Sequence, residues 1–316
     1  MAQTAAAAGG QTGGASTPAT APAAQTAAPA QANSADPFPP INPRYFTAQT
    51  PTVTTVDAFL RALWGYDANR LWRVEAIQTT PAAGVSKVTV FVTDRSPNAK
   101  VQSTAFFVLP DGKHAIAGDS GVVSFGATPF ADARAQLQEH ADGPSRGAQG
   151  KQLMLVEFAD MQCPHCKEAQ GAMDQLVRDF PNARVVYQNF PLTEIHPFSF
   201  KAAADGLCVA KAKPAAFWTY LQAVYDTQEG LTPETGDQTL ANAITKAGLE
   251  PRTIDACAAT PAIRDQVRSS VKLGDDVGVD QTPLLAVNGH LLPLTAIPYE
   301  TLKNMIAFQA HLDGVQ

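Results

Sequence analysis

The sequence predicts an α/β protein made of a small α+β domain and a larger domain with a helical insertion, both after an N-terminal tether. Three observations lead to this fold class. The 316 residues are enough for about two domains of ordinary size. Strand-like runs with alternating apolar residues follow one another before residue 130, which favours an antiparallel sheet. From Lys151 a strand-like, a helical and another strand-like run indicate a β-α-β unit.

Residues 1–50 are predicted to be a disordered tether. Before Phe38 they consist almost entirely of Ala, Pro, Thr, Gly and Gln. Such a segment cannot bury enough apolar surface to offset its chain entropy. Met1 is not followed by the basic and apolar regions of a signal peptide, so a cytosolic protein and a processed secreted protein both stay open at this point.

Residues 52–130 are predicted to form the small α+β domain, with one helix and an antiparallel sheet. TTVDAFLRALWG has its apolar residues on one helical face, with Thr54 or Thr55 as the N-cap. Three runs with β-branched or aromatic residues in near alternation predict strands, and turn-rich segments separate them. These runs are LWRVEAIQTT, KVTVFVTD and STAFFVLP.

Residues 131–150 are predicted to be a linker helix and loop. ADARAQLQEHA, residues 131–141, is a helical stretch with few apolar residues, so we expect this helix to bridge solvent between the two domains. DGPSRGAQG after it has the composition of a flexible joint.

Residues 151–316 are predicted to form the larger domain. LMLVEFA is a buried strand, the Cys pair opens a helix that runs to about Phe180, and ARVVYQNFPL is the next strand. The insertion, from about residue 195 to 278, is helical. QTPLLAVNG and HLLPL are strands joined by an Asn288-Gly289 turn, and PYETLKNMIAFQAHL is a closing helix.

The composition argues against two classes of function. With a net charge of −6 and 16% charged residues, the chain has no basic stripe of the kind that nucleic-acid binding needs. No apolar run approaches the roughly 20 residues of a membrane span, so we expect a soluble chain.

MQCPHCKE, residues 161–168, contains the motif that carries chemistry. Cys163 and Cys166 lie at positions i and i+3 of a helix start, on one face and one turn apart. Pro164 fits the first helical turn, which places Cys163 at the N-cap, where unpaired N–H groups and the helix dipole favour the thiolate. His165 can add positive charge or a donor and lower the thiol pKa further. A stabilised thiolate makes the disulfide a stronger oxidant. The pattern therefore predicts an oxidising pair with an exposed Cys163 and a more buried Cys166.

Other interpretations of the Cys pair are weaker. A zinc site needs about four ligands, and the remaining cysteines, Cys208 and Cys257, do not form a second close pair. A c-type haem attachment would need His where Lys167 stands. Two inert buried thiols would be an unusual use of a helix N-terminus after a strand. We therefore expect no metal and no bound cofactor.

Two residues outside the motif bear on the same chemistry. Glu157 lies in the apolar strand before the Cys pair, where burying a carboxylate is costly. It is either at an edge-strand position that faces water or a buried acid beneath Cys166, with a raised pKa, that exchanges protons as the inner thiol reacts. Pro283 follows Thr282, and because only about 5% of X-Pro bonds are cis, on its own it is expected to be trans.

The order of the predicted elements, with CPHC at a helix start and Thr-Pro before a strand, resembles the thioredoxin fold of the DsbA-like disulfide oxidoreductases. The match covers about residues 148–313. It implies Cys163 as the attacking and Cys166 as the resolving cysteine. It also implies Glu157 as the buried acid and Pro283 as a cis-proline that faces the Cys pair. Thr282 would then offer backbone groups to an extended substrate segment.

The first domain is similar to a different family. STAFFVLPDGKHAIAGDSGVVSF resembles the core of the dimerisation domain of the DsbC/DsbG disulfide isomerases, a cystatin-like α+β domain. This resemblance implies a homodimer. CPHC is the pair of the founding DsbA oxidase, whereas Thr282 before the proline is the isomerase choice, so the direction of electron flow stays open.

These resemblances imply a periplasmic or secreted thiol:disulfide oxidoreductase, its signal peptide removed, that introduces disulfides into secreted proteins at Cys163 and Cys166. The alternative is a dimeric isomerase or chaperone that reshuffles wrong disulfides. The expected partners are unfolded or misoxidised secreted proteins and a membrane redox partner, either a quinone-linked oxidant or a membrane reductant. In such an oxidising compartment we expect a structural disulfide between Cys208 and Cys257, with buried free thiols as the alternative.

Overall fold

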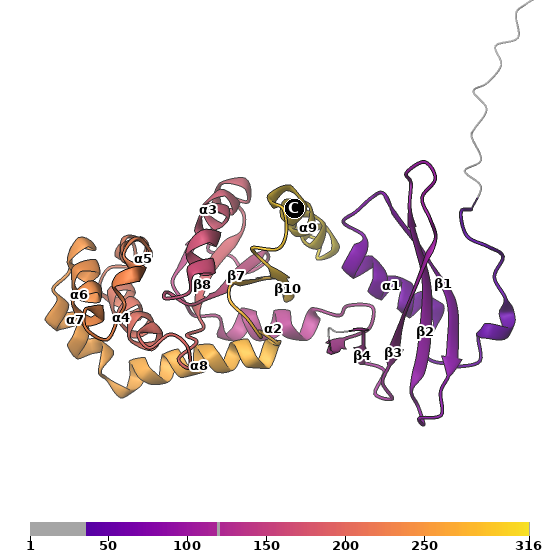
Figure 1. The fold of residues 1–316 in the computed structure, drawn as a ribbon, viewed down its shortest axis with the longest axis horizontal. Helices are drawn as coiled ribbons and strands as arrows, with labels where there is room; N and C mark the ends of the chain where they lie inside the picture. Colours follow the sequence, from indigo (N-terminus) through magenta and orange to yellow (C-terminus); the bar gives the residue numbers. More distant parts are fainter. Residues whose placement is uncertain (1–35, 119–120, 316) are drawn as a thin grey trace, which may run out of the picture. The chain divides into compact units, whose positions relative to one another are not determined.

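The described strands form two five-stranded sheets, in the orders β1-β2-β3-β4-β5 and β10-β9-β7-β8-β6 (Figure 1). The computed structural model describes residues 36–118 and 121–315, and the predicted tether lies outside the described residues as far as residue 35. The elements are η1 Pro43–Tyr45, α1 Val53–Trp64, β1 Arg70–Thr79, β2 Ser86–Asp94, β3 Gln102–Val108, β4 His114–Ile116, β5 Val122–Ser124, α2 Ala131–His140, β6 Ser145–Gly147, β7 Met154–Ala159, α3 Pro164–Asp179, β8 Arg184–Asn189, α4 Ser199–Ala212, α5 Ala216–Asp226, η3 Gln228–Gly230, α6 Gly236–Lys246, α7 Pro251–Ala258, α8 Pro261–Val277, β9 Leu284–Val287, β10 His290–Pro293 and α9 Tyr299–Leu312.

The first sheet is antiparallel at every strand pair. Helix α1 buries Phe59 and Leu60 in one core with the strand residues Val88 and Val90. Alternation along β2 explains this packing, because every second side chain of the strand points to the helix. The helix and the strands β1 to β3 are those that the sequence predicts, and the short strands β4 and β5 extend the sheet beyond them.

The first helix begins earlier than predicted. Its N-cap is Thr52, whose Oγ1 accepts a hydrogen bond from the Thr55 N–H at 3.1 Å. The expected cap at Thr54 or Thr55 is therefore wrong, because Thr52 satisfies the same cap preference and lies before both of them.

The last part of the predicted tether is held in place. The N–H groups of Thr47 and Ala48 both donate to the Ile77 carbonyl of β1 at 3.0 Å. Phe46 packs against the core under the first sheet. The prediction of a tether through residue 50 is thus wrong for these residues, which find backbone and apolar partners on β1.

The second sheet has β7 at its centre, parallel to β8 and antiparallel to β9. All of β7 is buried. Leu155 packs with α3 and α9 on one face, whereas Val156 and Phe158 pack with α2 and α8 on the other (Figure 1). Helices on both faces of a mixed sheet confirm the predicted α/β class, and the carboxyl end of β7 leads directly into the Cys motif.

The predicted linker is part of the second sheet's packing. Leu137 of α2 is 1% exposed and shares a core with Phe158, and Arg134 pairs with Asp313 at 3.0 Å. Strand β6, inside the predicted flexible joint, pairs with the edge of β8. The expectations of a solvent-bridging helix and a flexible joint are wrong, since the buried face of α2 is narrow and the edge of β8 supplies partners for a Gly-rich backbone.

The insertion is a cluster of helices, α4 to α8, around a core that includes Phe217, Tyr220 and Leu240. The sequence predicts this region as helical. The short helix α7, Pro251–Ala258, buries Ile254 and Ala258, which lie four residues apart on one helical face.

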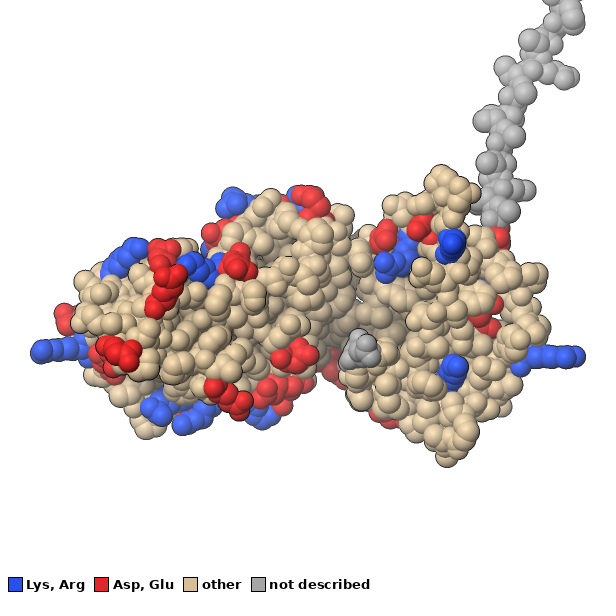
Figure 2. Space-filling view, in the orientation of Figure 1, with Lys and Arg blue, Asp and Glu red and all other residues tan. Residues whose placement is uncertain are grey.

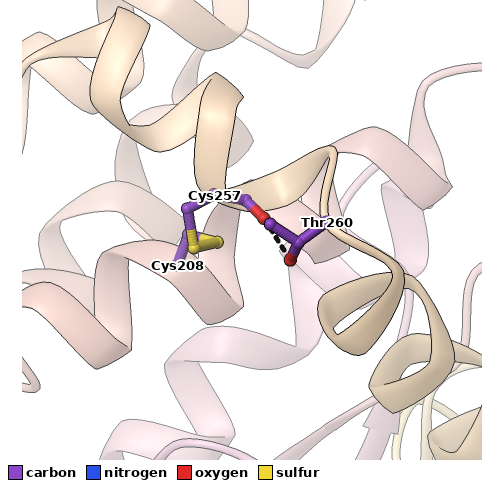
Figure 3. The surroundings of a disulfide bond; sticks show 3 residues. All are labelled: Cys208, Cys257 and Thr260. Atoms are coloured by element: carbon purple, nitrogen blue, oxygen red, sulfur yellow. Dashed lines mark hydrogen bonds between the residues drawn. A yellow bond between two sulfur atoms is a disulfide. The ribbon is translucent and has the colours of Figure 1, made fainter.

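A disulfide joins two helices of the insertion, as predicted. Cys208 of α4 bonds to Cys257 of α7, and their Cα atoms are 6.0 Å apart (Figure 3). Thr260 Oγ1 donates to the Cys257 carbonyl at 2.7 Å, at the turn between α7 and α8. The bond therefore fixes the eight-residue helix α7 to α4.

The surface shows mixed charge. On the face in Figure 2, Lys and Arg side chains lie among Asp and Glu side chains, with uncharged surface between them. Among the described residues, no helix combines the length and the apolar character needed to cross a membrane.

Candidate functional site

Cys163 is the N-cap residue of α3, in an extended conformation, with Pro164 at the first helical position. The Cys166 thiol donates to the Cys163 sulfur, and the backbone N–H groups of Cys166 and His165 add to its effect. Together they lower the pKa of Cys163 to about 5, against the opposing effect of burial. The helix start therefore does what its sequence predicts, which is to favour the thiolate.

Cys163 is less accessible than predicted. Only 5% of the residue is exposed, against the expectation of an exposed sulfur, while Cys166 is 0% exposed as expected. The Cys163 Sγ lies 3.8 Å from the carbonyl oxygen of Thr282. The order of exposure is as predicted, but the Thr282-Pro283 segment lies too close to Cys163 to leave its sulfur open, a contact made across more than a hundred residues of chain.

The Thr282-Pro283 peptide bond is cis. The trans bond expected for an isolated X-Pro pair is therefore not found here, and the cis-proline implied by the resemblance is present beside Cys163. Strand β9 begins directly after it at Leu284, next to β7 in the sheet. The sheet thus brings the Thr-Pro segment and the Cys motif together at the same edge.

Cys166 lies on the buried face of α3. Burial raises the pKa of its thiol, and the Cys163 sulfur beside it acts in the same direction. The backbone N–H of Asp160 donates to the Cys166 Sγ at 3.4 Å. Two sulfurs one helical turn apart therefore have opposite preferences, since one favours the thiolate and the other the thiol.

Of the two interpretations of Glu157, an edge-strand residue facing water or a buried acid, the structure agrees with the buried acid. Glu157 is 2% exposed in the central strand β7, so the edge-strand position facing water is wrong. Burial raises its pKa to about 7, while a hydrogen bond from Gln170 Nε2 at 2.8 Å opposes the rise. Gln170 Nε2 also donates to the Cys166 carbonyl at 3.2 Å, so this amide links the acid to the helix turn that carries the inner thiol.

The His165 side chain points to a neighbour on its own helix. Its Nδ1 lies 3.0 Å from Glu168 Oε2, and this exposed pair raises the imidazole pKa. The Cys163 thiolate raises that pKa further, so a charged His165 favours the thiolate in return. The predicted influence of His165 on Cys163 is present through both its backbone and its side chain.

Sequence reasoning missed the amides that tie the Cys motif to the insertion. Gln228 Nε2 donates to the carbonyls of Met161 and Cys163 at 2.9 and 3.0 Å. Gln162 donates to the Leu231 carbonyl at 3.0 Å and accepts from the Phe198 N–H at 2.8 Å. Isolated glutamines have no spacing signal, so these contacts could not be read from the chain.

The described residues contain no cluster of three or more His, Cys, Asp or Glu side chains that could hold a metal ion. Cys208 and Cys257 are bonded to each other and are not available as thiolate ligands. The Cys163 and Cys166 thiols are both free. The arrangement can therefore carry out chemistry between sulfur atoms, with Glu157 as the nearby acid.

A family model described as Thioredoxin matches residues 140–307, more than half of the chain. Curated relatives are Na(+)/H(+) antiporters. NhaA 3 of Salinispora tropica is 32% identical over 96 residues, which are 30% of this chain and 14% of that protein. NhaA 1 of Salinispora arenicola is 29% identical over 159 residues, 48% of this chain and 22% of that protein. The chain thus spans about a fifth or less of the length of these relatives.

Solved structures with a similar fold include a periplasmic thioredoxin-like protein from Salmonella enterica serovar Typhimurium. It is 24% identical, with a TM-score of 0.47 over 57% of this chain and 96% of that one. BdbD from Bacillus subtilis is 20% identical, with a TM-score of 0.48 over 54% and 93%. ScsC from Proteus mirabilis in a compact conformation is 22% identical, with a TM-score of 0.49 over 59% and 80%.

We expect the thiolate of Cys163 to form with a midpoint near pH 5, as read from its ultraviolet absorbance in the reduced protein. Replacing Cys166 with Ala removes the largest cause of the low pKa, so this midpoint should rise by about one unit or more. Cys163→Ala is the control that abolishes the titration. A midpoint near the ordinary value of about 8.5 in the unaltered protein would contradict the assignment.

Glu157→Gln should stabilise the protein at about pH 8 and leave its stability unchanged near pH 4. The folded-state pKa of Glu157 is raised from 4.5 to about 7, so its charge destabilises the fold as pH rises through that interval and fully above it. The gain in free energy of unfolding should be up to about 3 kcal/mol, measured by urea denaturation. The exposed Glu194→Gln is the matched control. Equal effects at both pH values would exclude the raised pKa.

Proposed function

The chain belongs to the thioredoxin family, and on that premise we propose that Cys163 and Cys166 catalyse thiol–disulfide exchange in protein substrates. The observation that carries this proposal is the pair of opposite thiol environments in a single helical turn. The pKa of Cys163 is lowered to about 5, whereas that of the buried Cys166 is raised. Such a pair is suited to one sulfur that bonds to substrate and one that stays inside.

The exchange proceeds in two sulfur transfers. A substrate thiolate bonds to Cys163 of the oxidised pair, the Cys163–Cys166 bond breaks, and the electron pair of that bond stays on Cys166. A second substrate thiolate then bonds to the substrate sulfur of the mixed disulfide, and Cys163 leaves as a thiolate. The substrate dithiol loses two electrons and the enzyme pair gains them.

We propose that Glu157 supplies the proton that Cys166 takes up during the exchange. Because burial raises the pKa of the Cys166 thiol, its thiolate takes up a proton after it leaves. Glu157, with a pKa of about 7, is protonated in about half of the molecules at neutral pH. It can therefore supply that proton to Cys166, through water or by way of Gln170, which is hydrogen-bonded to both Glu157 and the Cys166 carbonyl. In the reverse reaction it can take the proton back.

We propose that the chain acts mainly as an oxidase that introduces disulfides into its substrates. At neutral pH the low pKa of Cys163 stabilises the reduced form by about 3 kcal/mol relative to an ordinary thiol, which is about 60 mV in potential. A reduced form stabilised in this way makes the disulfide oxidising. The alternative is an isomerase, which would start from the reduced Cys163 attacking a wrong substrate disulfide.

We further propose a periplasmic or secreted location, with unfolded or misoxidised secreted proteins as substrates. The Cys208–Cys257 disulfide supports it, since such bonds persist in oxidising compartments. Thr282 and Pro283 beside Cys163 would bind an extended substrate segment through backbone groups. A membrane redox partner, a quinone-linked oxidant or a membrane reductant, would restore the pair after each turnover.

We also propose that residues 52–130 form a homodimer. Phe107, Ile116 and Val122 are directly opposite one another on β3, β4 and β5, and they are 40%, 40% and 62% exposed. An apolar row of this kind on a sheet face is suited to a second copy. It agrees with the resemblance of this domain to the isomerase dimerisation domain.

The oxidase proposal predicts a reduction potential for Cys163/Cys166 well above roughly −270 mV, the value of thioredoxin. Equilibration with glutathione measures it, and reduced substrate should be oxidised quickly. Cys163→Ala should abolish this activity. Rapid rescue of scrambled ribonuclease with a potential as low as thioredoxin's would instead favour the isomerase, and full activity of Cys163→Ala would defeat both.

The homodimer proposal predicts twice the chain mass by light scattering at micromolar concentration. Phe107→Ser with Ile116→Ser should shift the protein to a monomer, because the substitutions remove apolar area from the row. Ile41→Ser with Val53→Ser, which removes two exposed apolar side chains that lie outside the sheet, is the matched control. A monomeric unaltered protein would remove the proposal.

A further inference from the structure

The proposed exchange places negative charge on a sulfur that has no contact with solvent. When the Cys163–Cys166 bond breaks, its electron pair stays on the Cys166 Sγ. Cys166 is 0% exposed, so water cannot solvate this thiolate. Stabilisation must come from donors that the protein holds in place beforehand. The backbone N–H of Asp160, 3.4 Å from the Cys166 Sγ, is such a donor.

The side chain of Asp160 fixes the position of this N–H. Asp160 follows β7 and is 1% exposed. Its Oδ1 accepts from the Gln162 N–H at 2.7 Å, which closes an Asx turn into the Cys motif. Its Oδ2 accepts from the Leu192 N–H at 2.8 Å, in the segment after β8. The carboxylate thereby joins the ends of two neighbouring strands around the peptide that donates to sulfur.

His196 completes the surroundings of this carboxylate. Its Nδ1 lies 2.8 Å from Asp160 Oδ2, and since a carboxylate only accepts, the imidazole Nδ1 carries the hydrogen. His196 is held in turn, because its N–H donates to the Leu192 carbonyl at 2.9 Å and its carbonyl accepts from Ser199. His196 therefore reaches the Cys motif through Asp160.

Stability alone is a weak reason for this arrangement. Burying a carboxylate costs solvation that a partner at best offsets, and apolar replacements of buried ion pairs are often neutral or stabilising. A bare Asp160 carboxylate would also repel the thiolate forming on Cys166. Two hydrogen bonds, one from His196 to the carboxylate and one from the Asp160 N–H to sulfur, connect His196 to the reacting atom. Two more hold the carboxylate from the backbone.

We propose that Asp160 and His196 are positioning residues for Cys166, which hold the Asp160 N–H against the sulfur and so speed the release of Cys166 as the leaving thiolate. The proposal rests on the proposed exchange function. It adds two residues that act through a backbone donor and do not touch the substrate.

The test follows the opening of the oxidised pair by reduced glutathione in the full chain. Glutathione thiolate bonds to Cys163 as the Cys163–Cys166 bond breaks, and acid quenching followed by mass spectrometry of the intact protein detects the bound glutathione. Asp160→Asn replaces one acceptor oxygen with a donor, and His196→Phe keeps a ring without the donor. Both should slow opening about 10- to 100-fold, the effect of losing a hydrogen bond to a charged group. The thiolate midpoint of Cys163 should stay unchanged.

Two variants serve as controls. His196→Asn keeps a donor at the place of Nδ1 and should open within about threefold of the unaltered protein. Asp205→Asn removes another fully buried carboxylate, which pairs with Lys201 in the insertion, and should leave the opening rate unchanged. A slow His196→Asn as well as a slow Asp205→Asn would show general loss of packing and overturn the proposal.

The remaining outcomes are decisive. Unchanged opening in folded Asp160→Asn and His196→Phe overturns the positioning role while leaving the exchange function intact. If Asp160→Asn does not fold, as judged by circular dichroism, the His196→Phe and His196→Asn pair decides. If the unaltered oxidised protein does not react with glutathione at all, the exchange function itself fails, and this inference fails with it.

Discussion

The site depends on the contrast between two sulfur atoms one helical turn apart. Cys163 is at the N-cap of α3, where the Cys166 thiol and backbone N–H groups lower its pKa to about 5. Cys166 lies on the buried side of the same helix, where burial raises its pKa. Neither environment requires an unusual residue. Both follow from starting an amphipathic helix directly after a buried central strand, with a cysteine at the cap and another in the first turn.

The helical insertion shapes this site although it lies outside the sheet. Gln228 holds the carbonyls of Met161 and Cys163, and Gln162 reaches back to Leu231 and Phe198. These amides fix the turn into the Cys motif from the insertion side. The Cys208–Cys257 disulfide holds α4 and α7 within the same cluster of helices. The geometry of the turn that carries Cys163 therefore depends on the packing of the helical insertion, although the insertion contains none of the reacting atoms.

Local features of the site could be predicted from the sequence, because they rest on neighbours in the chain. The Cys pair and the helix after it are of this kind. The burial of Glu157 is one of two alternatives that the sequence leaves open. Contacts made across the fold could not be. The cover that Thr282 gives to Cys163, the pairing of β6 with β8 and the packing of Leu137 depend on which segments meet.

The outer thiol of Cys163 and the buried carboxyl of Glu157 lose their protons at different pH values. Cys163, with a pKa of about 5, is deprotonated at neutral pH, whereas Glu157, with a pKa of about 7, still holds a proton in about half of the molecules. The stored proton thus sits on the carboxyl and not on the outer sulfur. In the proposed exchange this proton would be available when Cys166, whose raised pKa makes its thiolate a strong base, leaves the disulfide. Burial of a single acid in β7 would then let the outer sulfur stay charged while the inner sulfur takes up the proton.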